Sequence, residues 1–122
     1  MHPRLHLILR LGLALTFLGH GIFALNGRMS WLPYLMTVGF EQDLAAQLMP
    51  IIGVLDLIVA LLLIFKPHKH LFLWCFIWTF AVSIIRPLSG ESWLEFVERG
   101  AFYAVSLMLF LNSLQSNKTA AP

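Results

Sequence analysis

Two titratable side chains stand out because they lie within long apolar segments. His20 lies in LILRLGLALTFLGHGIFAL, and Asp56 lies in LAAQLMPIIGVLDLIVALLLIF. A charged group in hydrocarbon costs about 2.5–3.5 kcal/mol on membrane-insertion scales, so such residues usually face other helices or a cavity. If both segments are helices, the two side chains lie at similar depths, since a helix rises only about 1.5 Å per residue. We therefore expect a contact between His20 and Asp56, either direct or through water.

Small and polar residues around these two groups indicate which helix faces are buried. They recur at helical spacing as Gly12, Thr16, His20 and Ala24, as Gly53, Asp56 and Ala60, and as Cys75, Thr79 and Ser83. Small residues let helices approach closely in lipid, so each stripe predicts a helix–helix interface. Thr16 and Thr79 are therefore predicted to lie beside His20 and Asp56 in one ligand-binding site. The His20–Asp56 pair has two interpretations: it locks helix packing, or it contacts a quinone, a proton or a small polar ligand. A third possibility is that these residues pair with other groups.

A cluster of charged residues is predicted near the ends of two further apolar segments, outside the hydrocarbon. Glu95 and Arg99 have i, i+4 spacing, Glu98 lies beside them, and Arg86 should lie at the same level. Arg86 and Arg99 are candidate ligand-binding residues if the cluster is an anion or headgroup site beside a cavity. The alternative is a solvated group of ion pairs that closes the end of the bundle.

Other chemistry is poorly supported. The remaining histidines are His2, His6, His68 and His70. No carboxylate or cysteine accompanies them, so no metal site is predicted, although imidazole is a common ligand. The single cysteine, Cys75, excludes an intrachain disulfide and a CxxC pair. The sequence contains no phosphate-binding glycine loop, nucleophile elbow or HExxH motif, so we do not expect the chain to be catalytic on its own.

Composition predicts that membrane-spanning helices position these residues. Of the 122 residues, 59% are hydrophobic and 11% charged, and the mean hydropathy is +0.81. Average soluble domains contain about 45–50% apolar and about 25% charged residues. A bilayer core needs about 20 helical residues, and four segments approach this length: residues 7–25, 44–65, 70–86 and 93–114. The basic residues are scattered, so nucleic acid is not an expected partner.

The connecting segments complete the predicted architecture, an all-α bundle of four membrane-spanning helices within residues 1–114. The link 26–43 contains MSWLPYLMTVGF, which predicts a short interfacial helix with Trp31 and Tyr34 at headgroup level. The short turn 66–70 predicts that the second and third spans are antiparallel neighbours. The polar tail 115–122 is expected to be disordered.

The distribution of basic residues predicts the orientation of the bundle. Five of them (Arg4, Arg10, Lys66, Lys69 and Lys118) fall on the side of the two termini, and three (Arg28, Arg86 and Arg99) fall on the other. This asymmetry favours an orientation with both termini inside. The first span resembles a signal peptide, but its best cleavage site, at Ile22-Phe23-Ala24, is poor, so we expect a retained helix.

Several short motifs resemble the DoxX-like family of small four-helix membrane proteins. Arg10-Leu-Gly12 followed by Phe17-Leu-Gly19-His20-Gly21 is similar to its R-x-G…F-x-x-H-G pattern. Gly53-Val-Leu-Asp56-Leu-Ile-Val-Ala60-Leu-Leu-Leu is similar to G-x-x-E-x-x-x-G-x-L-L, with Asp for Glu and Ala for Gly, and Glu98-Arg99-Gly100 is also similar. The resemblance implies a bundle in a bacterial-type inner membrane. It also implies a link to quinone and sulfur redox systems, where some members are described as subunits of thiosulfate:quinone oxidoreductase.

The leading hypothesis is an accessory subunit of a membrane redox complex that holds a quinone or another small apolar ligand near His20 and Asp56. One alternative is a proton-coupled small-molecule transporter that uses Asp56 as its membrane carboxylate. Another is a structural or assembly protein without a ligand. The expected partners are membrane lipid and either a protein of the redox complex or a second copy of the chain.

Overall fold

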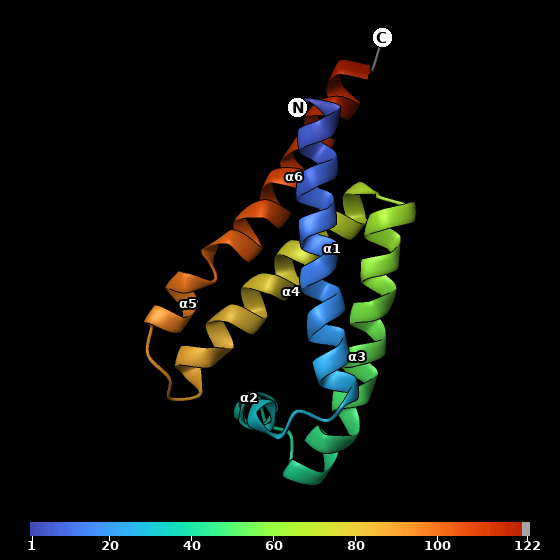
Figure 1. Cartoon of the computed structure of the whole chain (residues 1–122). Coiled ribbons are helices and arrows are strands. Elements are labelled where there is room, and N and C mark those ends of the chain that lie inside the picture. Colours follow the sequence, from blue (N-terminus) through green and yellow to red (C-terminus); the bar gives the residue numbers. More distant parts are fainter. Residues whose placement is uncertain (121–122) are drawn as a thin grey trace.

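The computed structural model describes the backbone of residues 1–120, and this part of the chain contains helices and no strands (Figure 1). The elements in chain order are α1 (Pro3–Leu25), the 3-10 turn η1 (Met29–Trp31), α2 (Leu32–Thr37), α3 (Gln42–Phe65), α4 (Lys69–Leu88), α5 (Leu94–Glu98) and α6 (Gly100–Ala120). Three of these described helices, α1, α3 and α4, are long and apolar enough to cross a membrane. They correspond to the first three predicted spans.

The fourth predicted span, 93–114, differs from the structure. It is divided at Arg99 into the short helix α5 and the longer helix α6. The apolar part of α6, Gly100–Gln115, is shorter than the other three spans. α6 also continues to Ala120, so residues 115–120 are helical and the predicted disorder is wrong for them. Residues 121–122 of the predicted tail lie outside the described residues.

Local sequence accounts for two of the helix starts. Pro3 occupies the first turn of α1, where its missing N–H costs no hydrogen bond, and the His2 side chain accepts a hydrogen bond from the Arg4 amide at 3.1 Å. His68 caps α4 in the same way, accepting from the His70 amide at 3.2 Å. Two of the histidines at this end of the molecule therefore satisfy backbone groups that a helix start leaves unpaired.

The helices associate as two pairs, α1 with α3 and α4 with α6 (Figure 1). The α1–α3 pair is held at backbone contact where Gly21 meets Gly53. A Cβ built on Gly53 would lie 2.8 Å from the Gly21 carbonyl oxygen. The predicted stripe of Gly53, Asp56 and Ala60 is buried, as expected for such an interface. On α1, however, the contacting glycine is Gly21, because a Cβ added to Gly12 would meet no atom within 4 Å.

The prediction that the second and third spans are neighbours is wrong in its packing. α3 and α4 are joined by a short connection, but they diverge from it and make few contacts with each other (Figure 1). The small-residue face of α3 packs against α1 and is therefore not available to α4. The core therefore joins the two pairs mainly through α1 and α6, with Leu13, Phe17, Leu63, Phe72 and Leu109 among its buried members.

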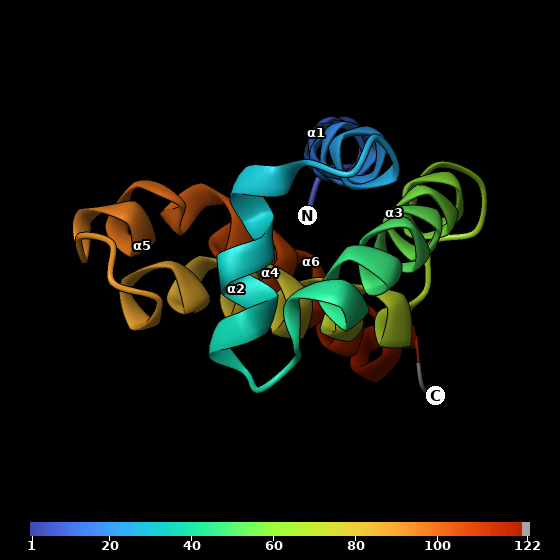
Figure 2. The same cartoon turned by 90° about the horizontal axis from the view of Figure 1, so that it is seen from below.

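The short helix predicted in the link 26–43 is present as η1 and α2. Viewed from below, α2 lies across the space between the α1–α3 pair and the α4–α6 pair (Figure 2). Leu32 anchors it by packing into a second buried cluster with Ala24, Ala45 and Met49. Consequently one end of the space between the pairs is covered by α2.

Candidate functional site

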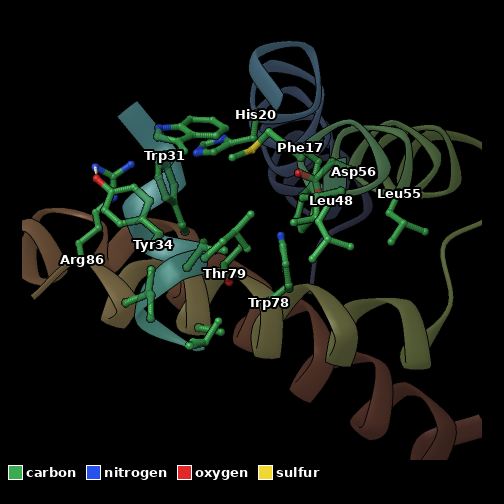
Figure 3. Close-up of a pocket in the computed structure, with 18 of the residues that line it drawn as sticks. Phe17, His20, Trp31, Tyr34, Leu48, Leu55, Asp56, Trp78, Thr79 and Arg86 are labelled. Carbon is green, nitrogen blue, oxygen red and sulfur yellow. Dashed lines mark hydrogen bonds between the residues drawn. The ribbon is translucent and has the colours of Figure 1, made fainter. Parts of the chain in front are cut away.

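A cavity of about 480 Å³ lies between the two helix pairs, beneath α2 (Figure 3). This volume falls within the range of about 300–1,000 Å³ that is usual for small-molecule sites. All six predicted ligand-binding residues contribute to its lining: Thr16, His20, Asp56, Thr79, Arg86 and Arg99. The rest of the lining is almost entirely aliphatic or aromatic and comes from α1, η1, α2, α3, α4 and α6.

His20 is held in place by its own helix and by two aromatic rings. Its Nδ1 lies 2.8 Å from the Thr16 carbonyl oxygen, so the Nδ1–H tautomer donates this hydrogen bond. Trp31 stacks on the imidazole with ring centroids 5.6 Å apart, and Phe102 meets it edge-on at 6.0 Å. With Nδ1 occupied, Nε2 is the ring nitrogen available to another partner.

Asp56 is only 5% exposed, although it lines the cavity. The indole nitrogen of Trp78 points from α4 toward the Asp56 side chain and is the polar group placed to donate to the carboxyl (Figure 3). Among the described residues, no hydrogen bond or ion pair joins Asp56 to His20. The direct form of the predicted contact is therefore wrong, since His20 bonds to the Thr16 carbonyl and stacks on Trp31, while Asp56 faces Trp78 on α4. A contact through water stays a prediction.

The two threonines form hydrogen bonds within their own helices. The Thr16 hydroxyl donates to the Gly12 carbonyl at 3.2 Å, and the Thr79 hydroxyl donates to the Cys75 carbonyl at 2.7 Å. A hydroxyl that has donated its hydrogen retains acceptor capacity. Thr16 and Thr79 therefore offer acceptors to the cavity.

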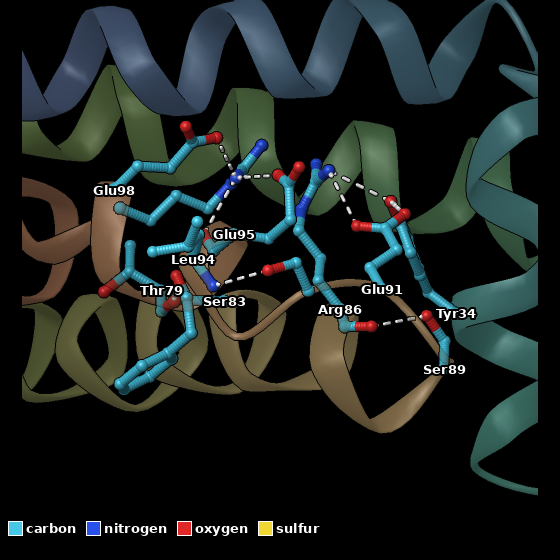
Figure 4. Close-up of polar contacts among 12 residues, drawn as sticks. Tyr34, Thr79, Ser83, Arg86, Ser89, Glu91, Leu94, Glu95 and Glu98 are labelled. Carbon is cyan, nitrogen blue, oxygen red and sulfur yellow. Dashed lines mark hydrogen bonds and ion pairs between the residues drawn. The ribbon is translucent and has the colours of Figure 1, made fainter.

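Arg86 joins α2 to the end of α4 (Figure 4). Its Nη1 donates to the Tyr34 hydroxyl at 3.0 Å and lies 3.9 Å from a Glu91 carboxylate oxygen. The Tyr34 hydroxyl in turn donates to Glu91 at 2.6 Å. Burial and this hydrogen bond raise the pKa of Tyr34, so the hydroxyl keeps its proton at neutral pH. We call Tyr34, Arg86 and Glu91 the α2 clasp.

Arg99 lies at the break between α5 and α6. Its Nη1 contacts Glu95 at 3.1 Å and Glu98 at 3.0 Å (Figure 4), in agreement with the i, i+4 pair expected from the sequence. It also donates to the Glu95 carbonyl at 3.1 Å, which satisfies a backbone group at this break. The predicted charge cluster therefore divides into the α2 clasp and the Arg99 group.

Sequence analysis missed several aromatic residues of the site. The sequence predicted Trp31 and Tyr34 at headgroup level and did not predict Trp74 or Trp78 as site residues. All four line the cavity, and Trp74 and Trp78 stack with centroids 5.6 Å apart. Trp74 and Trp78 share one face of their helix, close to the stripe residue Cys75. This spacing was the only feature of the sequence that could have placed them in the site.

The cavity opens sideways between α3 and α4. Ile51 and Leu55 of α3 and Trp74 of α4 line it and are exposed, and these two helices make few contacts with each other. These residues would face acyl chains in a bilayer. A lipid-soluble molecule could therefore enter without leaving the membrane.

A second, more polar pocket of about 430 Å³ lies near the N-terminal end of α4, where His6, His68 and Lys69 line it. Within the described part of the chain, no group of three or more His, Cys, Asp or Glu side chains is placed to hold a metal ion.

Comparison with known proteins adds no relative to this picture. No family model matches the chain, and no curated protein or solved structure matches it. The resemblance to the DoxX-like family thus depends on the short motifs alone.

Proposed function

We propose that this chain is a multi-pass membrane protein that holds a small, mostly apolar ligand with a polar end in the cavity beneath α2. The observation that carries the proposal is the combination of an apolar cavity, a side opening between α3 and α4, and a few polar groups gathered within it. Such sites typically combine apolar walls with a small number of placed polar groups.

The membrane arrangement in this proposal has four spans, with α5 and α6 together forming the fourth. The excess of Lys and Arg on the side of the termini supports an orientation with both termini inside. The motif resemblance supports a bacterial-type inner membrane.

A quinone is the ligand that the resemblance favours. Quinone carbonyl oxygens accept hydrogen bonds, and the cavity offers donors in the guanidinium groups of Arg86 and Arg99. In this proposal the chain is an accessory subunit that positions the ligand near His20 and Asp56. A redox partner protein, or a second copy of the chain, would complete the complex.

One observation favours a second candidate function. Asp56 is a buried carboxylate that lines a cavity, which is the arrangement used by proton-coupled membrane transporters. In that case, Asp56→Asn should abolish substrate flux into proteoliposomes without loss of folded protein.

The proposal is tested by purifying the protein in mild detergent and identifying bound small molecules by mass spectrometry. Val82→Trp places a large side chain in the cavity lining, whereas Ile77→Trp, on the same helix, replaces an exposed residue outside it. We expect wild type and Ile77→Trp to retain the same ligand and Val82→Trp to lose it.

If Val82→Trp retained as much ligand as wild type, the ligand would not be bound in this cavity. A folded wild type that carries no ligand, and that takes none up from added quinone, would favour the structural role.

A further inference from the structure

Two partly buried cations, Arg86 and Arg99, line one end of the cavity, while their acidic partners lie outside it. The side chains of Arg86 and Arg99 are 15% and 17% exposed. Those of Glu91, Glu95 and Glu98 are 38%, 37% and 63% exposed. Both arginines line the cavity, and none of the three glutamates does. The carboxylates pair with the arginines from outside the lining, so a ligand in the cavity meets guanidinium groups and none of these three carboxylates.

Both arginines retain donors for a further partner. A guanidinium group has five N–H donors. Among the residues that the structure describes, the hydrogen bonds and ion pairs of Arg86 and Arg99 are all made by Nη1. Nε and Nη2 of each group are therefore available to a ligand.

The two sides of the cavity differ in the residues that line them. Figure 3 shows Arg86 and Tyr34 at one side and Asp56 and Leu55 at the other. Away from the arginines the walls are mostly apolar, with Asp56 as the acidic group on that side, and they lead toward α3 and α4, where Leu55 and Trp74 are exposed. A molecule that fits this arrangement has one polar head and one apolar chain, with the chain directed toward the lipid.

We infer that the ligand is a single-chain amphiphile with an acidic head, either a carboxylate or a phosphate, and that Arg86 and Arg99 bind this head. The inference rests on the proposed function and narrows its ligand class. A guanidinium group gains an ion pair as well as hydrogen bonds from an anionic oxygen, whereas a quinone carbonyl offers only a neutral acceptor, so these groups favour the anion. Arginine also matches both carboxylate and phosphate geometry.

The tryptophans that line the cavity provide the assay. Trp31, Trp74 and Trp78 line it, so a brominated chain bound there quenches their fluorescence. Purified protein in detergent is titrated with three probes that share one chain: 9,10-dibromostearic acid, its methyl ester, and the lysophosphatidate that carries the dibromostearoyl chain. We expect saturable quenching by at least one acidic probe at a concentration at least about tenfold lower than for the ester.

Two variants locate the head group. Arg99→Gln removes one guanidinium group from the cavity and should reduce the preference for the acidic probe to about threefold or less. Arg28→Gln is the matched control, since Arg28 lies over the Phe23 and Trp31 rings but does not line the cavity. It should keep the full preference. Thermal unfolding of each variant verifies folding, and the wild-type comparison of acid with ester needs no variant.

The outcomes separate this inference from the proposed function. Tighter binding of the carboxylate or of the phosphate supports the inference and identifies the head. Equal saturable binding of all three probes overturns it and leaves the proposed function standing. A folded protein in which no probe gives saturable quenching overturns both, and an undiminished preference in folded Arg99→Gln overturns the role of Arg99.

Discussion

The contact between α1 and α3 leaves no room for a single added methyl group at Gly53. A Cβ there would lie 2.8 Å from the Gly21 carbonyl oxygen, 2.8 Å from the Leu25 amide nitrogen and 2.9 Å from Leu25 Cγ. Two of these three atoms belong to the backbone of α1, so they move only if the helix moves. Ordinary contact begins at 3.4 Å, and 3.4 minus 2.8 gives a required separation of 0.6 Å.

The expected cost of Gly53→Ala follows from this separation. Overpacking a well-packed interface typically costs about 1–3 kcal/mol. In lipid the association of helices depends mainly on close van der Waals packing, so contacts near the glycine also weaken when the helices separate. For a small domain each kcal/mol lowers the melting temperature by about 4–8 °C, so we expect a decrease of at least about 4 °C.

Cys75 gives a direct assay for this prediction. It is the only cysteine of the chain and is 0% exposed, so a thiol-reactive dye reports its release as the protein unfolds in detergent. Gly12→Ala, on α1, is the matched control because its Cβ would meet no atom within 4 Å. It should melt at or slightly above the wild-type temperature. Equal midpoints for Gly53→Ala and Gly12→Ala would show that the close approach at Gly53 does not limit stability.

Three further predictions concern polar contacts at the two ends of the bundle. Tyr34→Phe removes the hydroxyl of the α2 clasp, and a loss of about 1 kcal/mol should speed hydrogen exchange in α2 about fivefold; unchanged exchange would contradict the clasp. The folded state raises the pKa of Tyr34, so its contribution to stability is present below pH about 10 and is lost as the pH rises through the raised value. Melting curves against pH should show this loss in wild type and not in Tyr34→Phe. Arg10 donates from Nη2 to the Ile64 carbonyl at 3.4 Å, so Arg10→Gln should lower stability by about 1 kcal/mol in the dye assay, and an unchanged midpoint would show that this contact contributes nothing.

Sequence periodicity predicted the buried faces of α3 and α4 but not that of α1, where Gly12 is exposed and the buried residues are Leu13, Ala14, Phe17, Gly21 and Ala24. Asp56 and Thr79 lie on predicted stripes, and the structure buries both. Such predictions succeed because a stripe is a property of one helix, and hydrocarbon forces polar and small residues inward whatever the partner. The six predicted site residues line one cavity, although Arg86 and Arg99 were predicted from a charge cluster and not from a stripe.

The partners of those faces could not be predicted from the sequence. Gly12 and Gly21 both lie on α1, but only Gly21 meets a neighbouring helix, at a crossing point fixed by Gly53. The alignment of Trp78 with Asp56 likewise depends on how α4 diverges from α3. The short connection between α3 and α4 requires only that the joined ends of the two helices lie close together. It carried no information about the angle between the helices.

The cavity itself follows from the distribution of side-chain size on α3. Its small-residue face packs on α1, so the face toward α4 carries large side chains such as Leu48 and Ile52, opposite Trp74 and Trp78. In water, such a gap would favour closure, because exposed apolar surface is costly. In a bilayer that driving force is absent, since acyl chains are as apolar as the walls. Lipid chains therefore compete with any ligand for the apolar part of the cavity on nearly equal terms. Under the proposed function, selection among membrane components would come from the polar groups of the lining, so the polar end of a ligand, rather than its chain, would determine which molecule is bound.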